Sequence, residues 1–279
     1  MSKNKLVTPF LKWVGGKRQL MREITGLMPK KISVYYEPFI GGGAVLFNLQ
    51  PKKAVISDAN SELINVYKTI KDKPLELIAD LRRHKNEADY FYDIRGLDRK
   101  EEFLILTDIE RASRFIYLNK TCFNGLYRVN SAGEFNSPFG KYNNPNIVND
   151  TVLQAVSNYL NSNQIEILNC DYSETIFNSK IEKNDFVYFD PPYYPVSSSS
   201  NFTGYTQGGF NEQEQLKLRD LCNQLDSMGV KFLLSNSATK FIEEIYACFN
   251  ITYVKANRAI NSVADKRGEI NEVLIRNYD

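Results

Sequence analysis

The stretch that decides the fold of this chain is residues 186–193, with the sequence Phe186-Val187-Tyr188-Phe189-Asp190-Pro191-Pro192-Tyr193. Its four leading apolar residues predict a buried strand, and a carboxylate, two prolines and an aromatic ring follow at the carboxyl end of that strand. In open α/β sheets, ligands bind at this end of the strands. Asp190 and the carbonyl of Pro191 can accept hydrogen bonds from an exocyclic amine, and Tyr193 can stack on the base that carries it. The stretch therefore suits a planar heterocycle with an amino group, such as adenine.

The same residues also allow a simpler interpretation. Proline fixes φ and removes a hydrogen-bond donor, so the pair makes a stiff turn wherever it occurs. Turns favour Asp and Pro in general, and Asp190 can act as a plain cap at a proline-kinked strand exit. Motifs elsewhere in the sequence are needed to distinguish a ligand-binding loop from a plain turn.

A second strand-end motif lies closer to the N-terminus. Residues 34–36 predict a strand that runs into the turn Glu37-Pro38-Phe39-Ile40-Gly41-Gly42-Gly43-Ala44 and then into an apolar helical stretch. Strand, glycine-rich turn and helix form the first unit of a dinucleotide-type fold, where the glycines let a ligand approach the backbone. The turn begins with an acid. Glu37 would repel a pyrophosphate but attract an ammonium or sulfonium cation.

Two further acids stand at the ends of predicted strands. Residues 53–58 end in Asp58, roughly twenty residues after the glycine turn, where an acid typically binds ribose hydroxyls. Asp58 can instead cap the next helix, although Asn60 can do so equally well and would leave Asp58 free. Residues 164–168 predict a strand that leads to Asp171 and Tyr172. This pair can hold an adenine through an acceptor for its amine and through stacking.

Composition indicates a globular protein. The chain has 279 residues, of which 43% are hydrophobic, and its net charge is +2 from 35 basic and 33 acidic residues. These values predict one large domain or one domain with an inserted module. Any binding to nucleic acid must come from local patches, because the bulk charge is nearly balanced. No apolar span is long enough for a membrane helix, and the basic N-terminus lacks the apolar region of a signal peptide.

The cysteines and the single histidine argue against several kinds of site. Four cysteines without paired spacing do not suit a zinc site or a disulfide framework, and they fit a reducing, cytoplasmic location. His84 lies in a charged stretch, which argues against triad chemistry and histidine-rich metal sites.

The only tryptophan, Trp13, lies beside a Gly15-Gly16-Lys17 sequence. A glycine pair before a helix lets the backbone approach an anion, and Lys17 can pair with a carboxylate or a phosphate. The stretch is too short for a Walker loop, so it does not predict nucleotide triphosphate hydrolysis. A plain loop with a helix cap is the alternative.

The middle of the chain changes character after about residue 60. Apolar residues at helical spacing predict helices at about residues 63–70, 74–81 and 109–119, and the charges between them suit solvated faces. The segment 119–142 that follows is rich in Asn, Gly, aromatic and basic residues, with a hairpin signal at Ser131-Ala132-Gly133. This composition suits DNA groove recognition, where arginine binds guanine edges and aromatic wedges unstack bases. An ordinary ordered loop is the alternative.

The α/β pattern resumes after residue 147. Helices are predicted near residues 153–160, 211–225 and 241–249, and strands at 230–235, 251–254 and 273–275. Because no helix joins the last two strands, they predict an antiparallel hairpin at one edge of the sheet. Residues 194–210 predict a long loop beside the site, and residues 258–268 predict a polar loop.

Together these motifs resemble the D12 class of DNA adenine-N6 methyltransferases, the Dam family, over nearly the whole chain. They are most similar to its GATC-modifying members of the DpnII type. The resemblance rests on residues 10–17 (FLKWVGGK), 37–43 (EPFIGGG), 123–130 (FNGLYRVN), 133–136 (GEFN), 138–140 (PFG) and 190–193 (DPPY). The glycine turn comes first, the recognition region next and DPPY last, which matches the alpha subgroup.

The resemblance implies an α/β fold, a Rossmann-like seven-stranded methyltransferase sheet with an inserted helical DNA-recognition domain. Residues 1–60 and 148–279 would form the catalytic domain, which binds S-adenosylmethionine as methyl donor and needs no metal. Residues 61–147 would form the target-recognition domain. The expected partner is double-stranded DNA, without membrane association, and the expected state is a monomer or weak homodimer.

Roles for individual residues also follow from the resemblance. The expected cofactor-binding residues are Trp13, Lys17, Glu37, Pro38, Phe39, Gly41, Gly43, Asp58, Asp171, Tyr172 and Asp190. The expected catalytic residues are Asp190, Pro191, Pro192 and Tyr193. The expected DNA contacts are Lys12, Leu126, Arg128 and Pro138 as base readers, Phe123 as the intercalating wedge and Asn124 as a flanking contact. Some relatives carry Tyr where this chain has Phe123, so the wedge is kept but a hydroxyl contact is lost.

The implied activity is methyl transfer to N6 of a flipped-out adenine in GATC, in a restriction-modification system. Asp190 and the Pro191 carbonyl would accept the two N–H bonds of the amine and turn its lone pair toward the methyl group. Two alternatives are a methyltransferase for another exocyclic amine, such as cytosine N4 or an RNA base, and a catalytically silent DNA-binding protein. The intact acids Asp58, Asp171 and Asp190 argue against a silent protein.

Overall fold

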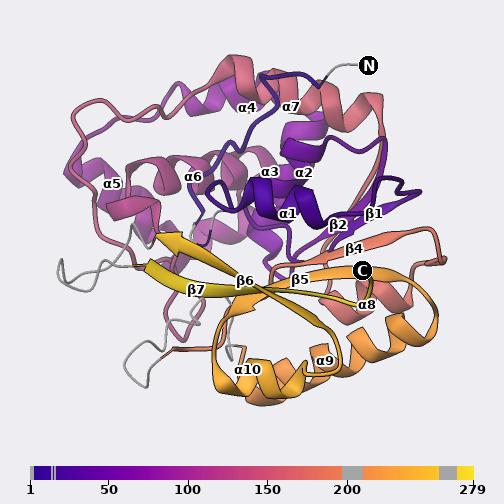
Figure 1. Ribbon diagram of the computed structural model, residues 1–279. Helices are drawn as coiled ribbons and strands as arrows, with labels where there is room; N and C mark the ends of the chain where they lie inside the picture. The colour runs from indigo at the N-terminus through magenta and orange to yellow at the C-terminus, as the bar shows by residue number, and fades with distance from the viewer. Residues whose placement is uncertain (1–2, 14, 16, 197–209, 258–268) are drawn as a thin grey trace.

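The computed structural model of this chain describes residues 3–13, 15, 17–196, 210–257 and 269–279. Its sheet has seven strands in the order β3-β2-β1-β4-β5-β7-β6 (Figure 1). The strands are β1 (Tyr35–Glu37), β2 (Lys53–Ser57), β3 (Gln164–Leu168), β4 (Phe186–Phe189), β5 (Lys231–Ser237), β6 (Asn250–Asn257) and β7 (Glu269–Arg276). The predicted seven-stranded α/β fold is confirmed.

The direction of pairing divides the sheet into two parts. Strands β1 to β5 pair in parallel, whereas β7 runs antiparallel to both of its neighbours, β5 and β6. The predicted antiparallel hairpin at one edge is therefore present. Parallel pairing brings the carboxyl ends of β1 to β5 to one side of the sheet, and the strand-end acids lie there.

The central strands are buried on both faces, because their side chains alternate between two apolar layers. Tyr35, Phe186 and Tyr188 face a core shared with the helices from the first two thirds of the chain. Val187 and Phe189 face a second core built with the helices that follow β3, β4 and β5. The apolar stretch 186–189 thus forms the middle of the molecule.

Helices cover both faces of the sheet (Figure 1). One face carries α1 (Met21–Leu27), α2 (Ala44–Leu49), α3 (Ser61–Asp72) and α7 (Asp150–Ser162). The other face carries α8 (Tyr172–Phe177), α9 (Glu212–Ser227) and α10 (Lys240–Ile245). Within the described residues, no helix combines the length and the apolar character that a membrane crossing requires.

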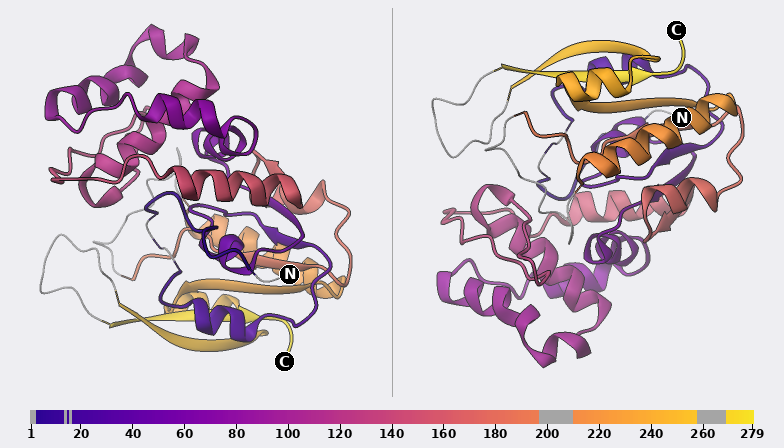
Figure 2. Two further views of the ribbon diagram at one scale, coloured as in Figure 1. Left: turned by 90° about the horizontal axis from the view of Figure 1, so that it is seen from above. Right: turned by 90° about the horizontal axis from the view of Figure 1, so that it is seen from below.

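In the sequence between β2 and β3, the chain forms a helical insertion that lies away from the sheet (Figure 2). It contains α4 (Pro74–Leu81), α5 (Ala88–Gly96), α6 (Asp108–Thr121) and the 3-10 turns η1 (Leu97–Arg99), η2 (Glu101–Ile105) and η3 (Phe123–Gly125). Helix α3 joins the insertion to the sheet. It packs along α6, while its Tyr67 hydroxyl donates to the Gly41 carbonyl at 3.0 Å and its Lys71 ammonium to the Ile165 carbonyl at 3.0 Å.

Local sequence signals set several helix starts. Asn60 caps α3 by accepting a hydrogen bond from the Leu63 N–H, and Pro74 is the first residue of α4. Thr107 and Glu110 form a reciprocal capping box at the start of α6. The predicted start of α9 is also present, because the Asn211 side chain accepts from the Glu214 N–H.

The structure differs from the sequence-based expectations in a few elements. Helices α5 and α8 were not predicted: α5 buries only Phe91, and α8 has six residues, so neither has a strong apolar period. Helix α10 ends at Ile245, four residues before Phe249, which packs on Phe232 instead. The predicted loops at 194–210 and 258–268 lie largely or wholly outside the described residues.

Candidate functional site

A buried ion pair lies at the carboxyl end of β4. The Lys17 Nζ is 2.8 Å from Asp190 Oδ1, and the two side chains are 5% and 22% exposed. Lys17 also donates to the Gly15 carbonyl at 2.6 Å. The N-terminal segment and the central strand thus meet at one charge pair, as the sequence suggested for a lysine that can bind a carboxylate.

The two oxygens of Asp190 have different surroundings. Oδ1 receives both the Lys17 ammonium and the Ser235 hydroxyl, the latter at 3.0 Å. Oδ2 receives no hydrogen bond or ion pair from another residue that the structure describes. Ser235 is itself fully buried and lies 3.2 Å from the Tyr188 hydroxyl. Asp190 is therefore anchored through one oxygen, and its second oxygen is available to a donor from outside the protein.

The loop after Asp190 is held by a buried polar network from β5 and α9. The Gln215 side chain donates to the Pro192 carbonyl at 3.0 Å and accepts from the Asn236 amide at 3.0 Å. Asn236 accepts from the Tyr194 N–H at 3.1 Å. The Pro191 carbonyl has no such partner among the described residues. The network therefore fixes the loop while leaving one carbonyl next to Asp190 as a free acceptor.

Tyr193 is held at one ring face and at its hydroxyl. The Lys17 ammonium lies 4.7 Å from the ring centroid, and the Tyr193 hydroxyl donates to Glu272 Oε2 on β7 at 2.8 Å. Burial and the nearby Asp190 and Glu272 carboxylates hold the pKa of the Tyr193 hydroxyl well above its usual value. Tyr193 thus stays neutral and presents an oriented aromatic face.

The glycine turn is shaped by close packing against Trp13. Gly41 and Gly43 have φ values of +46° and +68°, which favour glycine. A Cβ on Gly41 would stand 2.7 Å from the Trp13 Nε1 atom, so the indole lies directly on the turn. Asp58 accepts from the Gly41 N–H at 3.1 Å and from the Asn60 N–H at 3.0 Å. Asn60 provides the helix cap, and Asp58 stays at the turn.

Glu37 is a buried acid close to the ion pair. It is 2% exposed and accepts a hydrogen bond from the Tyr35 hydroxyl at 2.8 Å. Burial raises the pKa of Glu37 to about 8, with a further contribution from Asp190 that the Tyr35 hydrogen bond and Lys17 partly offset. Burial likewise raises the pKa of Asp58 to about 6. A cationic ligand would favour the ionised form of both carboxyl groups.

A cluster of aromatic rings forms a second part of the site. Phe39 stacks on Tyr172 with centroids 5.2 Å apart, and Phe210 packs on the edge of both. Asp171 and Tyr172 also line a pocket of about 480 Å³ between α8 and α9. Asp171 Oδ1 caps α8 through the Ser173 N–H and hydroxyl, so only part of its hydrogen-bonding capacity remains for a ligand.

A separate pocket of about 420 Å³ lies on the helical insertion, beside His84 and Asn146. It contains none of the predicted site residues. The strand-end surface carries far more of the expected chemistry, so we regard that surface as the candidate site.

The expected DNA contacts gather in the segment that follows α6. Phe123, Asn124 and Pro138 are exposed, and the Phe123 N–H donates to the Pro138 carbonyl at 2.8 Å. Lys12 is exposed beside them, with its ammonium 4.3 Å from the centroid of the Tyr142 ring.

Leu126 and Arg128 are only partly exposed. The Arg128 Nε donates to the Asn136 side chain at 2.6 Å, so the guanidinium is oriented by its own hairpin. The predicted hairpin is present as a bridge between Val129 and Phe135.

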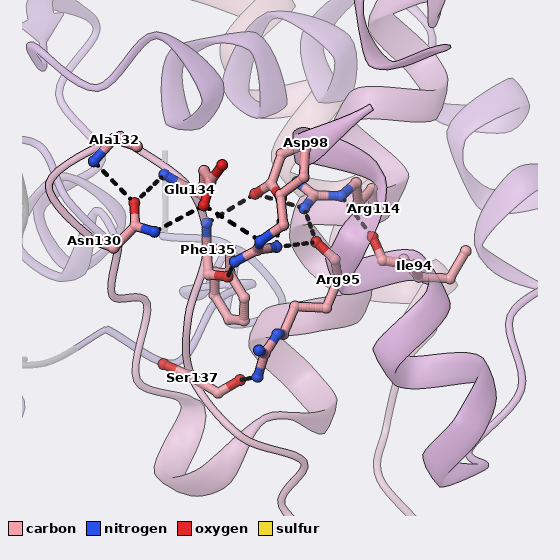
Figure 3. A network of polar contacts seen from close by, with 10 residues as sticks. Ile94, Arg95, Asp98, Arg114, Asn130, Ala132, Glu134, Phe135 and Ser137 are labelled. Carbon is pink, nitrogen blue, oxygen red and sulfur yellow. Dashed lines mark hydrogen bonds and ion pairs between the residues drawn. The ribbon is translucent and has the colours of Figure 1, made fainter. Parts of the chain in front are cut away.

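A charge network fixes this hairpin on the insertion (Figure 3). Asp98 Oδ2 accepts from the Phe135 N–H at 2.7 Å and pairs with the buried Arg114 at 2.8 Å. Arg99 pairs with Asp98 Oδ1 at 2.8 Å and donates to the Phe135 carbonyl at 2.9 Å. Arg114 also donates to the carbonyl of Arg95 at 2.8 Å, so the loop, η1, α5 and α6 form one rigid unit.

The structure brings the predicted residues into three groups. The first group contains Trp13, Lys17, Glu37, Pro38, Gly41, Gly43, Asp58 and the 190–193 loop. The second contains Phe39, Asp171 and Tyr172, and the third contains Lys12, Phe123, Asn124, Leu126, Arg128 and Pro138. Trp13 joins the first and third groups, because its ring also stacks on Tyr127 with centroids 5.8 Å apart.

Several residues at the site were missed by sequence reasoning. Ser235, Asn236, Gln215 and Glu272 hold the 190–193 loop, and Asn119 holds Lys12. The available signal for most of them was a polar residue near the carboxyl end of β5 or in the first or last turn of a helix. Their partners are tens of residues away, however, so periodicity alone could not identify them.

Comparisons with known proteins identify the family and the relatives of this chain. The family model for D12 class N6 adenine-specific DNA methyltransferase matches residues 13–260. The type II methyltransferase M1.LlaDCHI of Lactococcus lactis subsp. cremoris is 47% identical over 100% of this chain and 98% of its own length. The type II methyltransferase M.MjaIII of Methanocaldococcus jannaschii is 41% identical, covering 98% of this chain and 99% of its own. A DNA adenine methylase of Haemophilus influenzae is 34% identical, covering 95% and 92%.

The raised pKa of Glu37 predicts a pH-dependent loss of stability. The folded protein keeps a proton that the unfolded chain releases above its ordinary pKa, so the stabilising contribution is complete below pH 4.5 and is lost as the pH rises through about 8. Relative to Glu37→Gln, which does not titrate, the ligand-free wild type should lose about 2 kcal/mol of unfolding free energy between about pH 6 and 8. Urea denaturation at several pH values measures this.

The matched control is Glu166→Gln, which changes an exposed acid on β3. Its stability should follow the wild type at every pH. Parallel curves for Glu37→Gln and wild type would show that Glu37 is already ionised in the folded protein.

The network in Figure 3 predicts a second stability effect. Asp98→Ala leaves the buried Arg114 without its carboxylate and the Phe135 N–H without its acceptor, which should cost about 3 kcal/mol. Glu244→Ala is the control. It removes the partner of Lys240, and both side chains are well exposed, so it should cost less than about 0.5 kcal/mol. Equal urea midpoints for the two variants would contradict a structural role for Asp98.

Proposed function

This chain belongs to the D12 class of N6 adenine-specific DNA methyltransferases, and from that premise we propose that it methylates the adenine of GATC in duplex DNA. The choice of GATC rests on the segments 123–130 and 133–140, which resemble the recognition region of GATC-modifying enzymes. A role in a restriction-modification system is supported by the two type II methyltransferases among its relatives. A cytoplasmic location remains part of the proposal.

The observation that carries the catalytic assignment is that the two side-chain oxygens of Asp190 have different hydrogen-bond partners. Lys17 and Ser235 hold Oδ1, and Oδ2 points to no protein partner among the described residues. Beside it, the Pro191 carbonyl receives no hydrogen bond from the residues that the structure describes, whereas the Pro192 carbonyl accepts one from Gln215. Two acceptors next to each other match the two N–H bonds of an adenine amine.

These two acceptors are proposed to increase the reactivity of the substrate amine. The amine lone pair of adenine is delocalised into the ring, so the nitrogen is a weak nucleophile. Hydrogen bonds from both N–H groups to Asp190 and Pro191 hold the amine in a geometry in which its lone pair can face the methyl donor. Tyr193, with its ring fixed between Lys17 and Glu272, stacks on the base. After transfer the N6 nitrogen is cationic, and Asp190 Oδ2 accepts the proton that it releases.

The base reaches this loop only after it leaves the duplex, at a cost of a few kcal/mol. Phe123 is suited to fill the vacated space, because its side chain is 53% exposed and its backbone is tied to Pro138. Asn124 flanks it, and Lys12, Leu126, Arg128 and Pro138 are assigned to base reading. Double-stranded DNA is thus the proposed partner, bound by a monomer or weak homodimer.

The cofactor assignment is supported by the residues around the glycine turn. When bound, S-adenosylmethionine supplies the methyl group. Glu37 and Asp58, with pKa values raised to about 8 and about 6, gain from a cation in their vicinity, as the methionine end of this donor provides. Trp13, Lys17 and Gly41–Gly43 shape the cradle, while Phe39, Asp171 and Tyr172 offer rings and a carboxylate for its adenine.

We divide the chain accordingly into two functional domains. Residues 1–60 and 148–279 form the proposed catalytic domain, and residues 61–147 form the proposed target-recognition domain. The division is supported by the cluster of α4, α5 and α6 outside the sheet layers (Figure 2). Helix α3 and Trp13 pack against both parts and fix their relative position.

Methyl transfer to defined duplexes tests the proposed function. With tritiated S-adenosylmethionine, a duplex containing one GATC should incorporate label and an otherwise identical duplex without it should not. Asp190→Ala should abolish incorporation, because it removes both the anchor for Lys17 and the acceptor for the amine. Glu244→Ala, which alters a 63% exposed acid on α10, should keep wild-type activity. Label in both duplexes would remove the GATC assignment, and an active Asp190→Ala would remove the catalytic one.

Arg128→Ala tests the base-reading surface. If Arg128 reads a guanine, the variant should lose about 1–3 kcal/mol of discrimination at one base position only. Rates on duplexes that differ at single positions measure this, with Arg82→Ala on α4's C-terminal side as control, since Arg82 is 63% exposed and pairs with Asp150. A uniform loss on all duplexes would instead make Arg128 a phosphate contact.

A further inference from the structure

Asn119 occupies an unusual position in the last turn of α6. Its side chain is fully buried, and all three of its hydrogen bonds go to main-chain groups outside the helix. Its Oδ1 accepts from the Lys12 N–H at 2.9 Å, and its Nδ2 donates to the Lys12 carbonyl at 2.7 Å and to the Gly125 carbonyl at 3.1 Å. One amide therefore ties the N-terminal segment to the recognition loop.

Lys12 depends on this contact. It lies outside every helix and strand, and no backbone–backbone hydrogen bond to it is made by another described residue. Asn119 satisfies both its N–H and its carbonyl, as a neighbouring strand would. Without that amide, the main chain of Lys12 would have no polar partner among the described residues.

The Lys12 side chain is also directed by its surroundings. Its stem lies against Gly125: a Cβ on Gly125, where φ is +63°, would stand 2.5 Å from the Lys12 Cβ. Its ammonium lies over the Tyr142 ring, and the Tyr142 hydroxyl accepts from the Asn124 N–H at 2.9 Å. Lys12 thus enters the exposed surface made by Phe123, Asn124 and Pro138, although it comes from the other end of the sequence.

We propose that Asn119 is a specificity-positioning residue. It holds the main chains of Lys12 and Gly125 in a fixed relative position, so that the Lys12 ammonium reads a base of the same site that the 123–128 loop contacts. This inference rests on the proposed function, because it takes Lys12 as a base reader. Asn119 itself is buried and does not touch DNA. Its effect on recognition is therefore entirely indirect.

Removing the Asn119 amide should therefore have the same effect on base discrimination as removing the Lys12 side chain. In Asn119→Ala the Lys12 main chain loses two hydrogen bonds and the Gly125 carbonyl loses one, so the Lys12 ammonium is no longer held at a fixed position beside the loop. Lys12→Ala removes the ammonium itself. Both variants should relax discrimination at the same base position, and the double variant Lys12→Ala/Asn119→Ala should lose little more than either single variant.

The experiment measures kcat/KM on a GATC duplex and on duplexes with each single-base change, for wild type and the three variants. We expect the preference for GATC over one changed position to fall about tenfold in Asn119→Ala, as in Lys12→Ala, and the preference at the other positions to stay within about twofold. Ser113→Ala is the matched control. Ser113 is also fully buried in α6, but its hydroxyl is hydrogen-bonded to the His84 ring and not to Lys12 or Gly125, so discrimination should be unchanged.

Three outcomes would overturn the inference. An equal fall of kcat/KM on every duplex would make Asn119 a purely structural residue, and additive effects in the double variant would separate it from Lys12. Wild-type protein that methylates all duplexes alike would instead remove the proposed GATC function, and this is evident before any variant is made. If Asn119→Ala does not fold, Asn119→Ser keeps one donor and should give a smaller loss at the same position.

Discussion

The site depends on a single buried ammonium. Lys17 lies between acids that come from separate strands, 2.8 Å from Asp190 and close enough to Glu37 to lower its pKa against the effect of burial. Parallel strands bring their carboxyl ends together, and carboxylates gathered there without a cation would repel one another. The lysine also fixes the orientation of Asp190 and lies against the Tyr193 ring. The Lys17 Nζ atom therefore both compensates the charge of these acids and orients the groups proposed to contact the substrate.

The second determinant of the architecture is aromatic packing between the sheet and the insertion. Trp13 lies on the glycine turn and stacks on Tyr127, which in turn stacks on Phe115 with centroids 4.5 Å apart. The recognition segment thus packs against the same Trp13 indole that lies on the glycine turn. Helical packing and the Asp98 network then hold the hairpin, so packed side chains connect the proposed reading surface to the proposed methylation site.

Much of the fold could be predicted from the sequence, because the strands at 35–37, 53–57, 164–168 and 186–189 have short apolar or alternating patterns and end in acids. The roles of Asn60 and Asp58 followed from local capping chemistry. Helix α5 escaped prediction because it buries one residue, and α8 because it is a single short helix. Gln215, Ser235 and Asn119 could not be assigned, since their partners are 23, 45 and 107 residues away. Such contacts follow from tertiary packing, which periodicity does not encode.

The place of β7 in the sheet has a consequence for biosynthesis. It is the final strand of the chain, yet it lies between β5 and β6 and supplies the Glu272 that fixes Tyr193. Until the residues of β7 have left the ribosome, β5 lacks its neighbour and the loop at 190–193 lacks one of its anchors. Long-range pairing of this kind closes late. A nascent chain would therefore acquire a finished site only once β7 has been synthesised and has emerged.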